Sequence, residues 1–498
     1  MNRSQPTSAA IESDRRTSAA IRLWVPLGLV ATLLGLLTTG CRTYQEQNHV
    51  IQYWRQGRLT NAVSEANSMA KKKAKGKDAV IWHLEQGAVL RGAGRYEESN
   101  QAFDRAQNEI DEYAQKAKVR VGQETAAMLS NQANLDYEGR TYDGVMLNTY
   151  RALNYLQLGE PDKARPELIR AYQRQGDAVE LNKKRIAEAQ EAAAKNEHAA
   201  AIKKAEQDPR LQAEMMGSYT NLGVLSSYAN YVNPFTVYLD GLFFMVQAAD
   251  GSDLERARKS FERVVAYAPD NEYVKQDLAA VNDLINGKPL APTTYVIFET
   301  GCAPVRDQIR IDIPVVFTKV SYVGAAFPTL KPQGNYAPSL TVTADRSGGN
   351  TNGAPGNGVL ATTSLLASMD SIIGLEFKNE LPLIITKTIA STVIKAAGSY
   401  AVNEVGSHQQ NWLAALLQLG TAVYQMSVNI ADERTWTTLP KEFQVCHFPT
   451  PADRKIELEA PGTGQKIPVT IDDGTINIIY VKSITAGSPL LVTQFKLK

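Results

Sequence analysis

The sequence is poor in the residues that most often carry chemistry. Its 498 residues include only three cysteines, five histidines and five tryptophans. No two histidines stand at a spacing typical of metal ligands; they are His49, His83, His198, His408 and His447. Neither a Gly-x-Ser-x-Gly nucleophile elbow nor a His-Glu-x-x-His motif is present. We therefore expect no metal, no cofactor and no enzymatic activity.

The chain also lacks an excess of charge of either sign. It has 53 Lys plus Arg against 52 Asp plus Glu, which gives a net charge of +1. Such a balance produces no basic field that would attract nucleic acid, so we expect no nucleic-acid partner. A hydrophobic content of 44% is ordinary for a globular protein. The length is typical of two to four domains.

The first forty residues have the layout of an export signal. A polar segment with four arginines, residues 1–22, precedes the apolar run Leu23–Leu37. This run has the length of a signal-peptide core and is too short for a comfortable transmembrane helix. It ends at Gly40-Cys41 and resembles the lipobox of bacterial lipoproteins, although Thr38 stands where that motif usually has leucine.

The lipobox resemblance implies that residues 1–40 are a signal peptide and that Cys41 carries a diacylglycerol lipid. Several acyl chains together would anchor the chain more firmly than one. In Gram-negative bacteria, an Asp directly after the lipidated cysteine favours retention in the inner membrane. This sequence has Arg42 at that position, which implies the outer membrane, with the protein facing the periplasm. The alternative is an ordinary signal anchor in which Cys41 occurs by chance.

Residues 41–287 have the pattern of helical hairpins similar to tetratricopeptide repeats. In this pattern small residues lie where two helices meet, and a glycine or polar residue makes the turn. Four segments fit, with turns predicted at Gly57, Gly94 and Gly159 in three of them. The small and large residues recur at steps of four and three, as in Ser99, Phe103 and Ala106; Ala164, Leu168 and Ala171; and Ala257, Phe261 and Val264. An irregular helical bundle is the alternative.

Residues 41–287 also contain one insertion and one aromatic segment. Residues 178–211 are rich in Ala, Lys and Glu, which predicts a long exposed helix of roughly 45 Å, ended by Asp208-Pro209. We interpret it as a solvated helix, and a partner-docking arm is the alternative. The aromatic segment Met215–Val246 is expected to be core.

After a linker at 287–292, residues 293–498 are expected to form an α+β domain in which strands flank a helical segment. Residues 362–430 are predicted to be helical, including Leu381–Val402 and Trp412–Ile430. Asp472-Asp473-Gly474 predicts a hairpin turn. The Gly-rich segment 347–358 lacks phosphate-binding spacing and is expected to be a surface loop. Strands are predicted at Thr294–Glu299, Gln308–Phe317, Ser339–Ala344, Phe443–Phe448, Lys455–Leu458, Lys466–Ile471, Thr475–Val481 and Leu490–Leu497.

The two remaining cysteines, Cys302 and Cys446, could form a disulfide in an oxidising compartment or could be buried free thiols. Cys446 and His447 are adjacent on a predicted strand, so their side chains point to opposite faces and do not form a catalytic pair. Asp432-Glu433 is interpreted as a solvated cap in a turn rather than as an acid/base couple.

Two stretches carry a family resemblance. Residues Gly139–Gly159 and Arg434-Thr-Trp-Thr-Thr-Leu-Pro440 resemble a family of functionally uncharacterised bacterial lipoproteins with tetratricopeptide-like repeats. The genes of that family are often associated with those of lipoprotein activators of penicillin-binding proteins. The resemblance implies a role in envelope or cell-wall assembly and assigns no residue a function.

The leading hypothesis is therefore a lipid-anchored envelope scaffold or adaptor, because stacked helical hairpins form surfaces that hold partner proteins. Tyr96, Tyr150 and Tyr155 are the candidate contact residues, with a place in the core as the alternative. Two further hypotheses are an envelope enzyme that acts on glycan or lipid through residues 293–498, and a structural subunit of an envelope complex.

Overall fold

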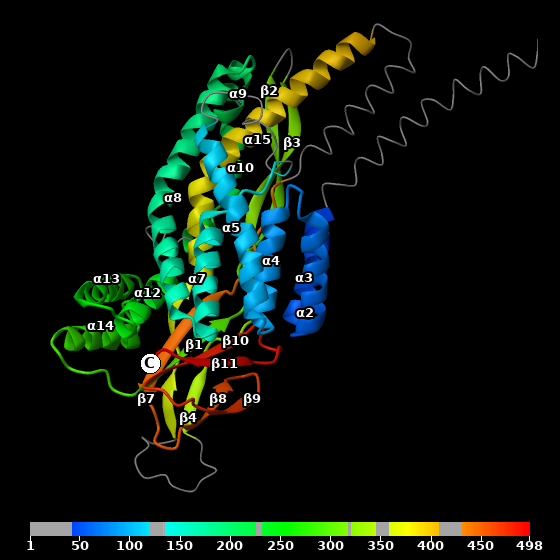
Figure 1. Ribbon diagram of the computed structural model, residues 1–498. Helices are drawn as coiled ribbons and strands as arrows, with labels where there is room; N and C mark the ends of the chain where they lie inside the picture. Colours follow the sequence, from blue (N-terminus) through cyan, green and yellow to red (C-terminus); the bar gives the residue numbers. More distant parts are fainter. Residues whose placement is uncertain are drawn as a thin grey trace, which may run out of the picture.

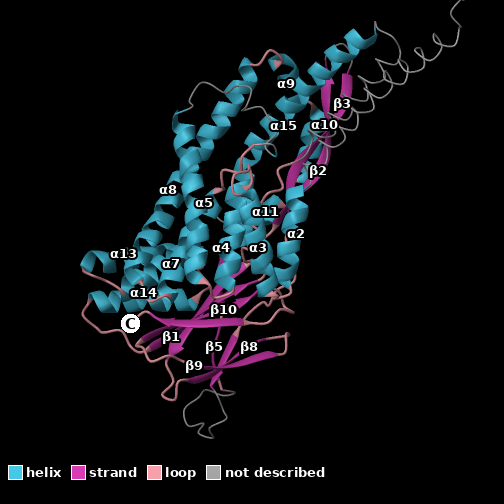
Figure 2. Cartoon of the chain, turned by 45° about the vertical axis from the view of Figure 1, so that its right-hand side comes forward, coloured by secondary structure: helices cyan, strands magenta, loops and turns pink. Residues whose placement is uncertain are grey.

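The computed structural model is an α+β protein in which a group of helices stands over mixed β-sheets (Figure 1). Figure 2 shows the strands of the two larger sheets gathered at one end of the molecule, beneath the helices. The predicted α+β class is therefore confirmed. The structure describes residues 42–119, 133, 135–225, 232–316, 320–344, 358–407 and 431–498.

Most helices before the first strand pair as antiparallel hairpins. The first three hairpins turn at Gly57, Gly94 and Gly159, whose φ angles are 69°, 74° and 74°. Residues other than glycine rarely adopt this left-handed backbone conformation, so glycine suits all three turns. The three predicted turn positions are confirmed. The hairpins are α2 (Arg42–Arg55) with α3 (Leu59–Lys73), α4 (Ala79–Gly92) with α5 (Tyr96–Val119), α7 (Thr141–Gln157) with α8 (Pro161–Lys195), and α12 (Pro234–Val246) with α13 (Gly251–Tyr267), which α14 (Glu272–Ile285) follows.

Glycine also permits the close approach of the two helices within a hairpin. A Cβ added at Gly87 on α4 would lie 2.4 Å from the ring of Phe103 on α5. Ser99 on α5 contributes a bond at the same crossing, because its hydroxyl donates to the Gly87 carbonyl at 2.7 Å. A Cβ at Gly241 on α12 would similarly lie 3.1 Å from Phe261 on α13. Small residues thus set the spacing of both hairpins.

The charged segment 178–211 is not one continuous exposed helix, so that prediction is wrong. Helix α8 ends at Lys195 because Asn196 turns to an extended conformation and its side chain accepts the His198 N–H at 3.0 Å. The next helix, α9, is not fully solvated either, since Ile202 on it is 2% exposed. The predicted break at Pro209 is confirmed. The remaining helices of this segment are α9 (Ala199–Glu206), α10 (Pro209–Ser218) and α11 (Leu222–Leu225).

The described strands form three sheets. The largest has the order β11-β10-β1-β7-β6, in which β1 runs parallel to β10 and the other neighbours are antiparallel. The second has the order β5-β4-β8-β9, and β2 pairs with β3 as a separate antiparallel ribbon. The bounds are β1 Thr293–Thr300, β2 Val305–Val316, β3 Val320–Lys331, β4 Thr341–Ala344, β5 Val359–Thr362, β6 Ser364–Ser368, β7 Glu442–Pro449, β8 Lys455–Ala460, β9 Gln465–Thr470, β10 Ile476–Ser483 and β11 Leu491–Lys496.

All eight predicted strands are present, but three of the observed strands, β3, β5 and β6, were not predicted. The helical prediction for 362–430 is wrong at its start, where β6 lies in the large sheet. Asp472-Asp473-Gly474 is not a hairpin turn, because β9 pairs with β8 whereas β10 pairs with β1 and β11. This turn carries the chain from one sheet to another.

A long helix, α15 (Met369–Ser407), contains the predicted helix Leu381–Val402 and has Pro382 inside it. The predicted helix Trp412–Ile430 lies outside the described residues. α15 begins at the large sheet, directly after β6, and extends from there beside α8 and the β2–β3 ribbon (Figures 1 and 2). Together with α9 and α10 they enclose a second core that includes Ile313, Phe327 and Phe377.

The main core joins the helical hairpins to the large sheet. Trp54 and Trp82 from the first two hairpins, Tyr150 from the third and Trp436 from the loop before β7 belong to one buried cluster. The Trp436 ring lies 5.9 Å from Tyr150 and crosses it edge-on. Residues far apart in the sequence therefore share one interior, and this places the helices directly against the sheet.

Candidate partner-binding site

The structure places the three candidate tyrosines differently. Tyr150 is fully buried and its hydroxyl donates to Glu299 at 2.9 Å, so it is a core residue. Tyr96 and Tyr155 are half-buried. Cys41, the predicted lipid attachment residue, lies outside the described residues, as do His408 and almost all of the Gly-rich segment 347–358.

Cys302 and Cys446 are both free and buried. Cys446 on β7 pairs with Val296 on β1, whereas Cys302 follows the far end of β1. The four residue-to-residue steps from Val296 to Thr300 alone span roughly 13 Å along a strand. Disulfides need Cα atoms within about 7 Å, so the structure favours two free thiols over the bond. Burial raises the pKa of both thiols.

The described histidines do not form a metal site. Across the described ranges, no group of three or more His, Cys, Asp or Glu side chains is placed to hold a metal ion. His83 is buried, and its pKa falls to about 4 because of burial and the nearby Arg105. His447 Nε2 lies 3.4 Å from Asp277 Oδ1, and two tyrosine hydroxyls, of Tyr238 and Tyr295, donate to the same carboxylate.

A buried ion pair lies where the hairpins meet the large sheet. Lys482 on β10 donates to Glu299 on β1 at 2.5 Å, and both side chains are at most 9% exposed. Tyr150 and Tyr480 donate to the same carboxylate at 2.9 and 2.5 Å. Burial alone raises the pKa of Glu299, but Lys482 and Arg91 outweigh burial and lower that pKa. The carboxylate is therefore ionised and fully partnered.

A second buried carboxylate fastens the loop that precedes β7. Glu85 on α4 accepts the N–H and hydroxyl of Thr437 at 2.7 and 2.5 Å, and those of Thr438 at 3.3 and 2.7 Å. Glu85 is 1% exposed, and burial raises its pKa to about 7. This single side chain thus satisfies four donors of the loop.

A third buried cluster links α7, α15 and β2. Glu380 on α15 accepts from Arg140 at 2.9 Å and from Arg306 at 2.8 Å. One turn earlier, Glu376 accepts the N–H groups of Thr141 and Tyr142 at 2.7 and 3.0 Å, and so caps α7. Burial, with the neighbouring Glu380, raises the pKa of Glu376 to about 8.

The same cluster corrects the interpretation of Asp432 as a solvated cap. Asp432 is 9% exposed and pairs with Arg434 at 2.7 Å and with Arg140 at 3.6 Å. Burial alone raises its pKa, but the two arginines outweigh burial and lower that pKa to about 2. In all three clusters the charged groups find their partners inside the protein, so their evident effect is to hold the helices, the loop and the sheet together.

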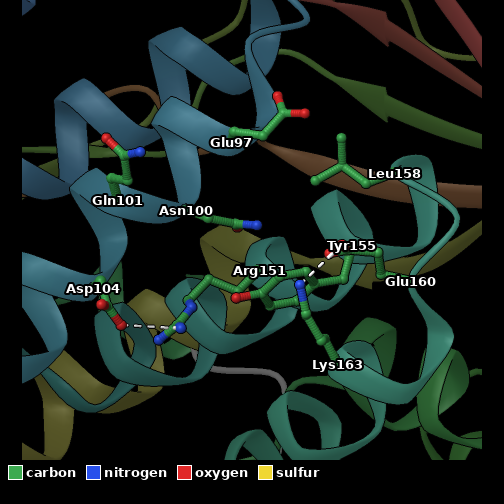
Figure 3. Close-up of a pocket in the computed structure, with 9 residues that line it drawn as sticks. All are labelled: Glu97, Asn100, Gln101, Asp104, Arg151, Tyr155, Leu158, Glu160 and Lys163. Atoms are coloured by element: carbon green, nitrogen blue, oxygen red, sulfur yellow. Dashed lines mark hydrogen bonds and ion pairs between the residues drawn. The ribbon is translucent and has the colours of Figure 1, made fainter.

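A pocket of about 340 Å³ lies between the second and third hairpins (Figure 3). Residues of α5, α7 and α8 and of the turn between α7 and α8 line it together, so no single hairpin forms it alone. The lining is mostly charged or amide side chains, with one leucine and one tyrosine. We call it the hairpin pocket; its lining residues are Glu97, Asn100, Gln101, Asp104, Arg151, Tyr155, Leu158, Glu160 and Lys163.

Both cations of the hairpin pocket have carboxylate partners in the protein. Arg151, which is 8% exposed in its side chain, pairs with Asp104 at 3.0 Å and with the buried Glu167 at 3.4 Å. Lys163 pairs with Glu160 at 2.9 Å. The dashed lines in Figure 3 mark one pair of each cation. The pocket therefore offers little unneutralised positive charge.

A chain of hydrogen bonds fixes the floor of the pocket. Asn154 on α7 donates to Ser99 and to Asn100 on α5, both at 2.9 Å. Arg91 on α4 donates to Asn154 Oδ1 at 2.8 Å. The second and third hairpins are thus tied by buried Ser99, Asn100 and Asn154 and by half-buried Arg91, and these bonds fix the relative position of the pocket walls.

Sequence reasoning identified only Tyr155 among the residues that line the hairpin pocket. The others are mostly polar residues of helices that carry no distinguishing pattern, and their convergence depends on how two hairpins stack. The buried Glu85 carried a usable signal, because it is the one charged carboxylate in the mainly apolar run from Ala79 to Leu90.

Comparison with known proteins gives no match: no family model, curated protein or solved structure is similar to this chain. Within the ranges that the structure describes, no helix combines the length and apolarity needed to cross a bilayer.

Proposed function

We propose that this protein is a lipid-anchored adaptor of the cell envelope that holds partner proteins through the hairpin pocket. The anchor is a lipid on Cys41 after removal of residues 1–40, and the site of action is the periplasmic face of the outer membrane. The proposal includes no catalytic step. It follows the family resemblance of Gly139–Gly159 in placing the protein in envelope or cell-wall assembly.

The observation that carries the proposal is the hairpin pocket itself. It is open to solvent, it is built from two successive hairpins, and its walls are held by buried hydrogen bonds. Stacked helical repeats commonly bind peptides or partner proteins on surfaces that several repeats form together. A rigid, polar pocket at such a junction suits the recognition of a protein segment.

The packing of small residues supports a repeat-like architecture for residues 41–287. In the third hairpin, Ala152, Ala164, Leu168 and Ala171 are all fully buried. The second hairpin uses Gly87 and Ser99 for the same close contact. We propose that these hairpins are tetratricopeptide-like repeats and that residues 293–498 form the α+β domain on which they rest.

The experiment is crosslinking in living cells followed by mass spectrometry, with the wild type and Cys41→Ala compared. The adaptor proposal predicts a defined envelope protein that is captured by the wild type and lost with Cys41→Ala. Capture by both forms would contradict the role of the lipid. Absence of any defined partner would contradict the adaptor role and would direct attention to glycan or lipid substrates of residues 293–498.

A further inference from the structure

The hairpin pocket has one carboxylate that no group in the described part of the chain neutralises. Its lining contains three carboxylates and two cations. Arg151 and Lys163 are paired with Asp104 and Glu160, as described above. Glu97, on the first turn of α5, is exposed and makes no ion pair or hydrogen bond with the described part of the chain. The net charge of the lining is thus one negative, located at Glu97.

A second, independent feature points to a ligand. Asn100 lies one turn after Glu97 on α5 and is 8% exposed. Its Oδ1 accepts from Asn154, so its orientation is fixed and its amide NH₂ group is directed into the open space of the pocket (Figure 3). That NH₂ group has no acceptor among the described residues, and it is open to solvent in the pocket, since it is not one of the fully buried side-chain atoms without a partner. A carbonyl oxygen of a ligand can take the place of water on this oriented donor.

The opposite wall supplies apolar surface. Leu158 and Tyr155, at the end of α7, are half-buried and face α5 across the pocket (Figure 3). An alkyl chain that enters the pocket can therefore lie against carbon atoms, while its end reaches a carboxylate. Lysine and arginine side chains combine these two properties, because a long apolar stem carries a cationic head.

We infer that the hairpin pocket binds a lysine or arginine side chain on an exposed segment of a partner protein. The cationic head pairs with Glu97, the stem lies on Leu158 and Tyr155, and an adjacent backbone carbonyl of the partner accepts from the Asn100 amide. An acidic segment fits poorly, because both cations of the pocket already have carboxylate partners. This inference rests on the proposed adaptor function and specifies the chemistry of the partner.

The test is fluorescence anisotropy with the purified full-length chain and three labelled peptides, each of four Gly-X repeats, where X is lysine, norleucine or glutamate. We expect the lysine peptide to bind, and the norleucine and glutamate peptides to bind at least about tenfold more weakly, which is the usual effect of one charge-assisted contact. Glu97→Gln should weaken lysine-peptide binding by a similar factor, whereas Asn100→Ala should weaken it severalfold.

Glu98→Gln is the matched control, because Glu98 is the next residue on α5 but pairs with Arg95 outside the pocket lining. Equal losses in Glu97→Gln and Glu98→Gln would overturn the inference, as would unchanged binding in Glu97→Gln or preference for the glutamate peptide. Since Glu97 is exposed, its substitution should leave the fold intact, which thermal unfolding checks. If cells still yield a defined partner that Glu97→Gln also captures, the adaptor function stands and only the basic-segment inference fails.

Discussion

Glu85 on α4 and Thr437, 352 positions later in the chain, are joined by two short hydrogen bonds of 2.7 and 2.5 Å to one carboxylate oxygen. The other oxygen serves Thr438 in the same manner. Both threonines belong to the Arg434–Pro440 segment that carries part of the family resemblance. A helix of the second hairpin thus fixes the loop that leads into the central part of the large sheet.

Removal of that carboxylate should destabilise the whole fold. Glu85→Ala leaves four donors of Thr437 and Thr438 without an acceptor in a buried site, so we expect the free energy of unfolding to fall by about 3 kcal/mol or more. Urea unfolding followed by circular dichroism measures the change. Glu98→Ala, an exposed substitution, should change the free energy by less than about 0.5 kcal/mol. Similar values for the two variants would contradict the structural role of Glu85.

The raised pKa of Glu85 predicts a pH dependence of stability. The folded state binds a proton at Glu85 with a pKa of about 7, against the usual value of 4.5. Between these values the folded state holds more protons than the unfolded state, so the free energy of unfolding falls as pH rises. The Glu85 contribution is present below about pH 4.5 and is lost by pH 7, a change of order 3 kcal/mol.

Unfolding free energies at several pH values between about 4.5 and 7.5 test this sign. Glu376, with a pKa raised to about 8, acts in the same direction, so a variant without Glu85 should keep part of the pH dependence. Glu85→Gln should therefore reduce the slope of the wild-type profile over this range without removing it. Asp432, with a pKa lowered to about 2, acts oppositely and reduces stability only in stronger acid. His83, with a pKa lowered to about 4, opposes Glu85 in this range, so the comparison with Glu85→Gln isolates the Glu85 contribution. Equal slopes for the wild type and Glu85→Gln would contradict the proton assignment at Glu85.

The close crossing of α4 and α5 predicts a sharp difference between two glycines. Gly87→Ala would place a Cβ 2.4 Å from the Phe103 ring, so we expect a loss of about 1–3 kcal/mol through overpacking. Gly176→Ala on α8 meets no atom within 4 Å and replaces a helical glycine, so it should stabilise by up to about 1 kcal/mol. Thermal unfolding of both variants measures the contrast. Stabilisation by Gly87→Ala would show that the two helices lie farther apart.

The burial of the two thiols predicts how they react with an alkylating reagent. Cys302 and Cys446 should resist alkylation in the native protein, because both are buried and their pKa values are raised. Both should react with iodoacetamide after unfolding in the absence of reductant. Mass spectrometry of the peptides shows directly whether each cysteine is alkylated. A disulfide-linked pair of the Cys302 and Cys446 peptides, from protein isolated from the oxidising envelope, would contradict the placement of β1 and β7.

The sequence was sufficient for features that depend on local patterns. Alternating apolar residues identified Gln308–Phe317 as a strand, and turn glycines such as Gly94 identified the hairpins. The strand β3 was missed because Gly324 and Pro328 interrupt its pattern. The guanidinium of Arg310 on β2 lies over Gly324, since a Cβ there would be 2.1 Å from the Arg310 side chain. Such a cross-strand contact is invisible along the chain.

The candidate site depended almost wholly on tertiary packing. Glu97 and Asn100 look like ordinary polar residues on a helix, and only the stacking of the third hairpin on the second turns them into one wall of a pocket. The charge clusters behave similarly, because the partners of Arg140 lie at Glu380 and Asp432, which are distant in the sequence. Pairings of this kind arise from topology rather than from residue spacing.

The most direct test of the adaptor proposal is site-specific photocrosslinking in cells with a photoreactive amino acid at Gln101 in the hairpin pocket. The matched control carries the same amino acid at Lys466, on the edge strand β9. We expect one defined envelope protein to be captured from Gln101, lost with Cys41→Ala and absent from the Lys466 sample. Equal capture from both positions, or none from Gln101, would contradict the hairpin pocket as the partner-binding site.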